Sequence, residues 1–413
     1  MNKIKALFAI AVIACLTNCR KESNLNAPQA SSHPGLSSVS LNDAEKIAKT
    51  YQESIIRLPG STRNQLSVSG NANSSGGLIS DVNFSKKNIK ESFSMTDDAH
   101  NIIAHVFNYE GGGFLVVSST LKEFPILGYS STNVFPKNIS INNNINGWIH
   151  HQAIRVQQLQ SGQLKEKDSA LIRNQWSSFR TQTSPQSSSS MAKASIMPYW
   201  VGAAYYGPYM STTWGQGTGY DTYCPLDPNS VTGDGHDPTG CVATAFAQIM
   251  KYWHFGHYAG YSPDYSDASM PGYMASNNTA QLMRNLGIVL SSIYTSTGTG
   301  TSVGSTTASN TFSYFGYSRL CTYQAGSESN LANAVFAYTA PYIITGGDHC
   351  WVIDGMKQIV SINGVQLAHP INYFFCNFGW DGANNGYFKY GAINPPNDNS
   401  LNYNDHIMFG EHP

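Results

Sequence analysis

The stretch TGCVATAFAQIMKYW, Thr239–Trp253, places a cysteine directly after a glycine and at the start of an apolar periodic segment. Its apolar residues recur at the spacing of a 3.6-residue helix and form one stripe, namely Val242, Ala245, Phe246, Ile249, Met250 and Trp253. We therefore expect a helix that begins near Cys241 and is buried along one side. The unpaired N–H groups and the dipole of a helix N-terminus favour a thiolate, which makes Cys241 a candidate nucleophile.

A cysteine at this place can also be an ordinary core residue, because a free thiol behaves as a small hydrophobe. The segment GGDHCWVIDG, residues 346–355, favours the catalytic interpretation. Two glycines there lead to a histidine at the start of an apolar, β-branched run. A strand that begins at His349 would hold the imidazole rigidly, as a general base requires, although a core histidine is the alternative.

A third segment, YFFCNFGWDG at residues 373–382, predicts a buried strand that runs into a glycine-containing turn. Asn377 is placed to accept the imidazole N–H of His349 and to fix its tautomer, the third role in a Cys-His-Asn arrangement. Trp380 is placed to shield that hydrogen bond from water. Each has an ordinary alternative, since Asn377 can be a turn residue and Trp380 a core residue.

Together these segments resemble the streptopain family of bacterial cysteine peptidases, over roughly residues 198–413, and the weaker N-terminal part resembles the family's inhibitory prodomain. The resemblance implies a papain-like α+β fold, in which a central helix carrying the nucleophile packs on an antiparallel sheet carrying the histidine. It also implies Cys241 as nucleophile, His349 as base, synthesis as an inactive precursor and a preference for an apolar substrate side chain. Two positions depart from the family pattern: Phe378 replaces a tryptophan, and Asp348 replaces a glycine.

Oxyanion stabilisation needs a second donor beside the backbone N–H of Cys241. Gln216, in the segment TWGQG at residues 213–217, has a suitable side chain, although it can also be a plain loop residue. In the family a glutamine precedes the histidine by a few residues, and Thr345 stands at the matching position here. Gln216 is therefore the oxyanion candidate.

The N-terminus predicts export. Lys3 and Lys5 precede an apolar run, residues 6–16, that is too short to span a bilayer, as in a signal peptide. The segment LTNC that ends at Cys19 resembles a lipobox, so Cys19 is the lipidation candidate, with Cys15 as a competing site and cleavage without lipid as the alternative. We expect export from a bacterial cytoplasm to the cell envelope, with release or secretion after processing and membrane contact only through the lipid.

The chain divides into five expected parts: a signal peptide at 1–19, a flexible tether at 20–40, a small α+β inhibitory prodomain at 41–180, a serine-rich linker with the processing site at 181–196, and the papain-like catalytic domain at 197–413. The elements expected in the prodomain are helices over about 42–54 and 148–159 and strands over 102–109, 113–118 and 126–130. In the catalytic domain we expect a loop at 295–310 and a helix over 327–338.

The composition argues against a nucleic-acid-binding protein and against a disulfide-rich one. The formal net charge is −1 with 49 charged residues among 413, which leaves no electrostatic footprint for nucleic acid. Beyond the signal peptide and Cys241, four cysteines permit three pairings, and we expect no disulfide framework; they are Cys224, Cys321, Cys350 and Cys376.

We expect no cofactor and no metal. The aspartates at 221, 227, 234 and 237 lack calcium-loop spacing and predict a solvated loop. His254 and His257 are explained by a helix C-terminus rather than by zinc.

The expected function is a secreted or surface-anchored cysteine endopeptidase made as a zymogen, whose partners are protein or peptide substrates and its own prodomain. Two alternatives stay open. Another acyl-transfer enzyme, such as a transglutaminase or a cell-wall amidase, can use the same Cys-His chemistry on a related fold. A non-catalytic lipoprotein that binds proteases is the second, although the presence of both Cys241 and His349 counts against it.

Overall fold

The computed structural model describes residues 37–57, 79–137, 145–166, 168–183, 199–301, 305–318, 321–346, 349–390 and 406–409. Ser37–Pro413 forms one compact unit. The expected signal peptide, Cys15, Cys19 and most of the expected linker lie outside the described residues, and so does Asp348. None of the helices in the described ranges combines the length and the apolar content needed to cross a membrane.

The N-terminal region, residues 37–183, contains α1 (Leu41–Thr50), β1 (Gln52–Arg57), β2 (Ile79–Asn83), β3 (Ile89–Thr96), β4 (Ile102–Tyr109), β5 (Phe114–Ser118), β6 (Ile126–Ser130), α2 (Ile145–Ser161) and α3 (Ser169–Thr183). The predicted strands β4, β5 and β6 and the predicted helix α2 are confirmed. The first helix starts earlier than expected, because Ser40 rather than Asn42 is its N-cap and accepts the Asp43 N–H at 3.1 Å.

The catalytic region follows with β7 (Tyr199–Tyr206), α4 (Cys241–Trp253), α5 (Asn277–Val289), β8 (Ile293–Thr295), β9 (Gly298–Gly300), α6 (Ser305–Tyr314), β10 (Thr322–Ala325), α7 (Glu328–Tyr338), β11 (Tyr342–Gly346), β12 (His349–Ile362), β13 (Val365–Asn377), β14 (Gly386–Lys389) and β15 (His406–Phe409). The helix that starts at Cys241 and the strand that starts at His349 are confirmed, and so is the helix after Ser327. The loop expected at 295–310 is wrong, since β9 and the start of α6 lie there. The polar composition of this segment gave no sign of a helix. Helix α6 packs inward through Phe312, which is buried.

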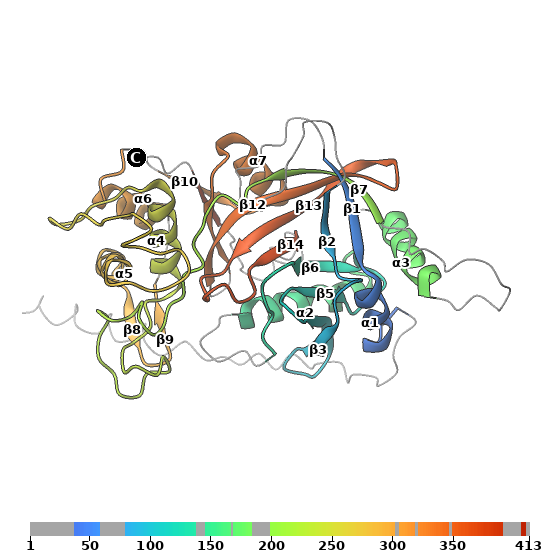
Figure 1. Ribbon diagram of the computed structural model, residues 1–413, viewed down its shortest axis with the longest axis horizontal. Coiled ribbons are helices and arrows are strands. Elements are labelled where there is room, and N and C mark those ends of the chain that lie inside the picture. The colour runs from blue at the N-terminus through green and yellow to red at the C-terminus, as the bar shows by residue number, and fades with distance from the viewer. Residues whose placement is uncertain are drawn as a thin grey trace, which may run out of the picture. The chain divides into compact units, whose positions relative to one another are not determined.

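One large sheet joins the two regions (Figure 1). Strands β11 to β14 pair antiparallel, and the N-terminal strand β6 continues the sheet by pairing antiparallel with β14, where Phe388 lies opposite Gly128. A Cβ at Gly128 would lie 2.4 Å from the Phe388 ring, so the pairing of β6 with β14 requires glycine at this position. Elsewhere β1 pairs parallel with β7, which pairs antiparallel with β12.

The apolar interior consists of three clusters. Among the described residues, those that form the helical core all lie from Met210 onward, and they surround α4, α5 and α6. The two other clusters, here called the shared cores, combine residues of both regions. One places Phe114 and Phe135 with Trp351, Phe378 and Trp380, and the other packs α1 and the N-terminal strands against Val201, Ala203, Ile359 and Tyr373.

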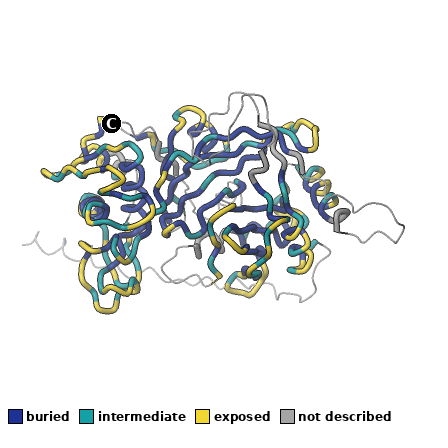
Figure 2. Tube along the Cα trace, viewed as in Figure 1, coloured by how far each residue is buried: buried dark blue, intermediate teal, exposed yellow. Residues whose placement is uncertain are grey.

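Helix α4 is more buried than its sequence predicts. Every residue from Cys241 to Lys251 is buried, not only the apolar stripe. Figure 2 shows buried backbone in this group of helices and along the long strands, with exposed segments at the loops. Two polar side chains of α4 have partners inside the protein: Gln248 Oε1 accepts a hydrogen bond from Asn377, and Lys251 donates to the Tyr265 carbonyl.

Candidate active site

Cys241 is the first residue of α4 and is 9% exposed. Gly240 precedes it with φ 88°, and a Cβ there would lie 3.1 Å from Thr299, so the approach to the helix requires glycine. Gly240 has no side chain to cap the helix. The N–H groups of the first turn therefore stay directed at whatever negative charge develops beside the thiol.

His349 starts β12, pairs with Gly346 of β11 and is 8% exposed. Its Nε2 lies 3.0 Å from the Phe378 carbonyl oxygen, and because a carbonyl can only accept, Nε2 carries the hydrogen. Its Nδ1 has no hydrogen-bond partner among the described residues. Burial lowers the pKa of His349 to about 4, against the smaller opposing effect of the Phe378 bond. The ring is therefore neutral at pH 7, with a free lone pair on Nδ1, the form a general base needs.

Aromatic side chains enclose this imidazole. The Trp380 ring stacks on it with centroids 4.7 Å apart, and Trp351 stacks at 5.7 Å. Phe378, at the position where the family has an indole, stacks on Trp380 at 5.0 Å. Trp380 thus lies against His349, where shielding would require it.

The expected hydrogen bond between Asn377 and His349 is not formed, so the contact predicted for this pair is wrong. The Asn377 Nδ2 instead donates to the Thr212 carbonyl at 2.7 Å and to Gln248 Oε1 at 3.0 Å. Register explains the difference. Asn377 lies opposite Val352, three residues beyond His349, so the turn after β13 and its Phe378 carbonyl come level with the imidazole.

Asn377 therefore ties the end of β13 to α4. Gln248, its partner, was not predicted as part of the site. The available signal was a polar residue inside an otherwise apolar helix, because a buried amide requires a partner. The role of the Phe378 backbone carbonyl had no signal in the sequence, since any residue supplies that group.

Gln216 lies between the same turn and the segment that leads to Cys241. Its Nε2 donates to the Gly379 carbonyl at 3.2 Å, and its own backbone carbonyl accepts the Thr239 N–H at 2.9 Å. Gly379 needs glycine because its φ is 72° and a Cβ would lie 3.0 Å from Thr244. Gln216 remains a prediction as an oxyanion donor.

Most of the aspartate-rich loop is exposed, as predicted, but Asp221 and Asp237 are buried. Burial, with Asp234 adding to the effect, raises the pKa of Asp221 to about 7. Within the described ranges no three His, Cys, Asp or Glu side chains form a group that could hold a metal. His254 ends α4 in the left-handed conformation, as a C-cap. None of the five cysteines in the described ranges forms a disulfide.

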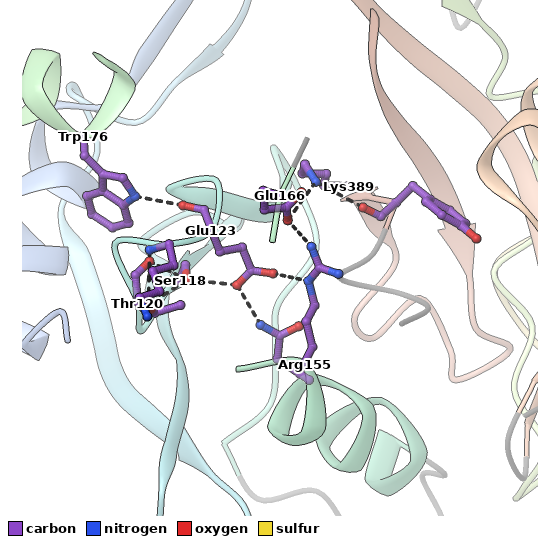
Figure 3. A network of polar contacts seen from close by, with 10 residues as sticks. Ser118, Thr120, Glu123, Arg155, Glu166, Trp176 and Lys389 are labelled. Atoms are coloured by element: carbon purple, nitrogen blue, oxygen red, sulfur yellow. Dashed lines mark hydrogen bonds and ion pairs between the residues drawn. The ribbon is translucent and has the colours of Figure 1, made fainter. Parts of the chain in front are cut away.

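Salt bridges connect the strands on the histidine side with the N-terminal region. Lys357 of β12 pairs with Glu53 of β1, both fully buried. Figure 3 shows a second set, in which Lys389 of β14 lies 3.8 Å from Glu166, and Arg155 bonds both Glu166 and Glu123. Burial opposes the ionisation of Glu166, but Lys389 and Arg155 hold its pKa below the ordinary value.

Comparison with known proteins agrees with this geometry. Residues 214–279 and 263–388 match the Peptidase C10 family, and residues 37–155 match the Spi protease inhibitor family. No curated protein matches the chain. Among solved structures, a Prevotella intermedia prointerpain A fragment with a mutated cysteine is 20% identical, covering 79% of this chain and 99% of its own with a TM-score of 0.52.

A second solved structure, active wild-type Prevotella intermedia interpain A cysteine protease, is 21% identical and covers 50% of this chain and 96% of its own, with a TM-score of 0.38. The prointerpain likeness shows the fold, which is a papain-like α+β fold. The chain belongs to the peptidase C10 family, the streptopain family of cysteine peptidases, and carries a Spi-type inhibitor domain ahead of its peptidase domain.

Proposed function

We propose that the chain is an exported cysteine endopeptidase, made as a zymogen, in which Cys241 is the nucleophile and His349 is the base. The observation that carries the proposal is the pair of placements at the site. Cys241 starts a helix whose first turn lacks a side-chain cap, and His349 has its Nε2–H bound to a carbonyl, which leaves Nδ1 as an acceptor.

The proposed reaction needs no cofactor. His349 Nδ1 takes the thiol proton, and the Cys241 thiolate attacks the peptide carbonyl carbon. The oxyanion forms near the Cys241 N–H and the Gln216 side chain, and His349 then protonates the leaving amine as the C–N bond breaks. Water, deprotonated by the same imidazole, hydrolyses the thioester and restores the thiol.

Latency is supported by the state of the site. Among the described residues His349 Nδ1 makes no hydrogen bond, and the side chains of Cys241 and His349 are both buried. The N-terminal region also packs directly on the histidine side through the shared cores. We propose that cleavage within 181–196 lets this region leave and that the imidazole then reaches the thiol.

Expression of residues 20–413 with Cys241 intact or changed to alanine tests the proposal. The intact protein should release a fragment of about 24 kDa, the share of the chain that 197–413 represents, and should then cleave casein. The Cys241→Ala chain should stay full length and inactive. The matched control is Cys321→Ala, a buried cysteine of the same helical core, which should process normally.

Two outcomes contradict the endopeptidase. If the activated protein leaves casein intact but crosslinks proteins or cleaves muropeptides, the chain is a different acyl-transfer enzyme. If iodoacetamide modifies Cys241 no faster than Cys321 after activation, Cys241 is not an activated thiol.

We also propose that Cys19 is lipidated and tethers the precursor to the cell envelope, which agrees with its position after a short apolar run. Processing at 181–196 would then release the peptidase domain, because the lipid stays on the N-terminal part. Fractionation of cells should place the precursor with membranes and the fragment in the medium. A mature fragment found only with membranes would exclude release.

A further inference from the structure

A hollow of about 350 Å³ opens on the α5 side of the catalytic region, away from the thiol. Its lining combines three tyrosines, four carboxamides and one small residue: Tyr223, Tyr258, Ala259, Tyr261, Asn277, Asn278, Gln281 and Asn285. None of these side chains carries a charge. The turn at 258–261 follows the C-terminal end of α4, so the length of that helix, about 18 Å, separates the hollow from Cys241.

The aromatic wall is rigid. Tyr258 and Tyr261 exchange both backbone hydrogen bonds, at 2.9 and 2.8 Å, around a two-residue turn, so their side chains lie on the same face. The turn places Ala259 at φ 48°, a conformation that alanine rarely adopts. Tyr258 stacks on Phe315 with centroids 5.3 Å apart, and the Tyr261 hydroxyl donates to the Asn278 carbonyl at 3.0 Å.

The opposite wall offers paired polar atoms. Gln281 Nε2 donates to Asn285 Oδ1 at 3.0 Å, one helical turn along α5. This leaves Gln281 Oε1 as an acceptor and Asn285 Nδ2 as a donor, neither with a protein partner in the described part of the chain. Asn278 adds a further donor through its Nδ2, because its Oδ1 already accepts from Tyr261.

We propose that this hollow binds a neutral sugar unit of a glycan. A sugar ring presents an apolar C–H face that packs on a tyrosine ring, and neighbouring hydroxyls that each need a donor and an acceptor, which is what the two walls supply. A charged ligand would find no opposite charge in the lining. Peptide recognition by strand addition is disfavoured, because no lining residue belongs to a strand.

Such a site would hold the peptidase at glycan-bearing surfaces or substrates while Cys241 acts elsewhere. Its binding does not depend on the peptidase reaction, so it can be measured with the thiol removed. A failed sugar-binding assay therefore leaves the proposed function untouched, and an inactive enzyme leaves the sugar site untouched.

The test uses the full chain carrying Cys241→Ala, which prevents self-processing. Calorimetry and saturation-transfer NMR with glucose, galactose, mannose and N-acetylglucosamine should find at least one sugar that binds with Kd on the order of 1 mM. Tyr223, 43% exposed, can be altered with little effect on folding. Tyr223→Ala should weaken binding at least about tenfold, whereas Tyr223→Phe should keep it within about threefold because the ring remains.

Tyr273→Ala is the matched control, a 75% exposed tyrosine outside the hollow, and should bind as the parent does. Gln281→Ala is a second variant from the polar wall and should also weaken binding, with an unchanged thermal midpoint. The proposal is overturned if no sugar binds, if Tyr223→Ala and Tyr273→Ala behave alike, or if a blocked dipeptide or glucuronate binds as well as the best neutral sugar.

Discussion

The two halves of the catalytic site are built on different supports. Cys241 begins a helix whose core contains only residues of the catalytic region. His349 lies on strands whose apolar face is completed by the N-terminal region, since Trp351, Phe378 and Trp380 share one core with Phe114 and Phe135. Removal of the N-terminal region should therefore change the surroundings of the base while leaving the nucleophile in place.

Buried lysines show the same contrast. Lys251 in α4 pairs with Asp267, which is 82% exposed, whereas Lys357 in β12 pairs with Glu53, which is 3% exposed. A carboxylate at the surface can return to water when its partner is lost. A carboxylate in a core cannot, so the histidine half depends on the N-terminal region through charge as well as through apolar packing.

The largest expected effect comes from Lys357→Met in the full chain carrying Cys241→Ala. The change leaves Glu53 charged and uncompensated, and the free energy of unfolding should fall by about 3–5 kcal/mol. Urea titration measures it. The matched control Lys251→Met should cost about 1 kcal/mol or less, because Asp267 stays hydrated.

A second variant tests the cause of the Lys357 effect. Glu53→Gln combined with Lys357→Met removes both charges and should recover at least half of the lost free energy. Equal losses for Lys251→Met and Lys357→Met would abolish the contrast between the two halves.

A fall in pH should have an intermediate effect on the free energy of unfolding. The pKa of His349 is about 4 in the folded chain and about 6.5 when unfolded, so the unfolded chain takes up the proton first as pH falls. Stability from this group is complete above pH 6.5 and is lost between 6.5 and 4, by roughly 3 kcal/mol. His349→Phe, which keeps an aromatic ring, should remove that share of the pH dependence.

The slope that remains in the His349→Phe chain combines His105, whose pKa burial lowers, with Asp221 and Asp354, whose pKa values burial raises to about 7 and about 8. The two carboxyl groups act in the opposite direction, because their contribution to stability is lost as pH rises, so the difference between the parent and His349→Phe chains isolates the imidazole. Unfolding free energies measured from pH 4 to 8 for the parent and His349→Phe chains test this contribution of His349. An unchanged slope in His349→Phe would mean that the imidazole is not held neutral in the folded precursor.

The smallest effect is expected from loss of the hydrogen bonds that connect Asn377 of β13 with α4. Asn377→Ala loses the bonds to Thr212 and Gln248 and should lower the free energy of unfolding by about 2 kcal/mol. A cycle with Gln248→Leu should show a coupling of about 1 kcal/mol. The pH profile of Cys241 alkylation after activation should not move, because Asn377 does not bond His349; a clear shift would give Asn377 the orienting role that the sequence predicts.

Much of the catalytic region follows from local sequence. Periodicity and a preceding glycine predict α4 and its first residue, and an apolar β-branched run predicts β12 from His349 onward. The N-terminal strands β4, β5 and β6 follow in the same way. Strands β1 and β7 were not predicted, because their pairing joins segments about 145 residues apart and neither carries a distinctive pattern.

The groups that can do the chemistry are recognisable from the amino-acid sequence: a cysteine at a helix start, a histidine at a strand start and a glycine-containing turn beyond them. Which of their atoms meet depends on how the strands and helices pack. Strand register brings the Phe378 carbonyl to His349 and turns Asn377 toward α4, since a shift of three residues along β12 changes the partner. Burial likewise depends on tertiary packing: α4 is enclosed by other elements of the catalytic region, and the imidazole stays neutral in surroundings that both regions build.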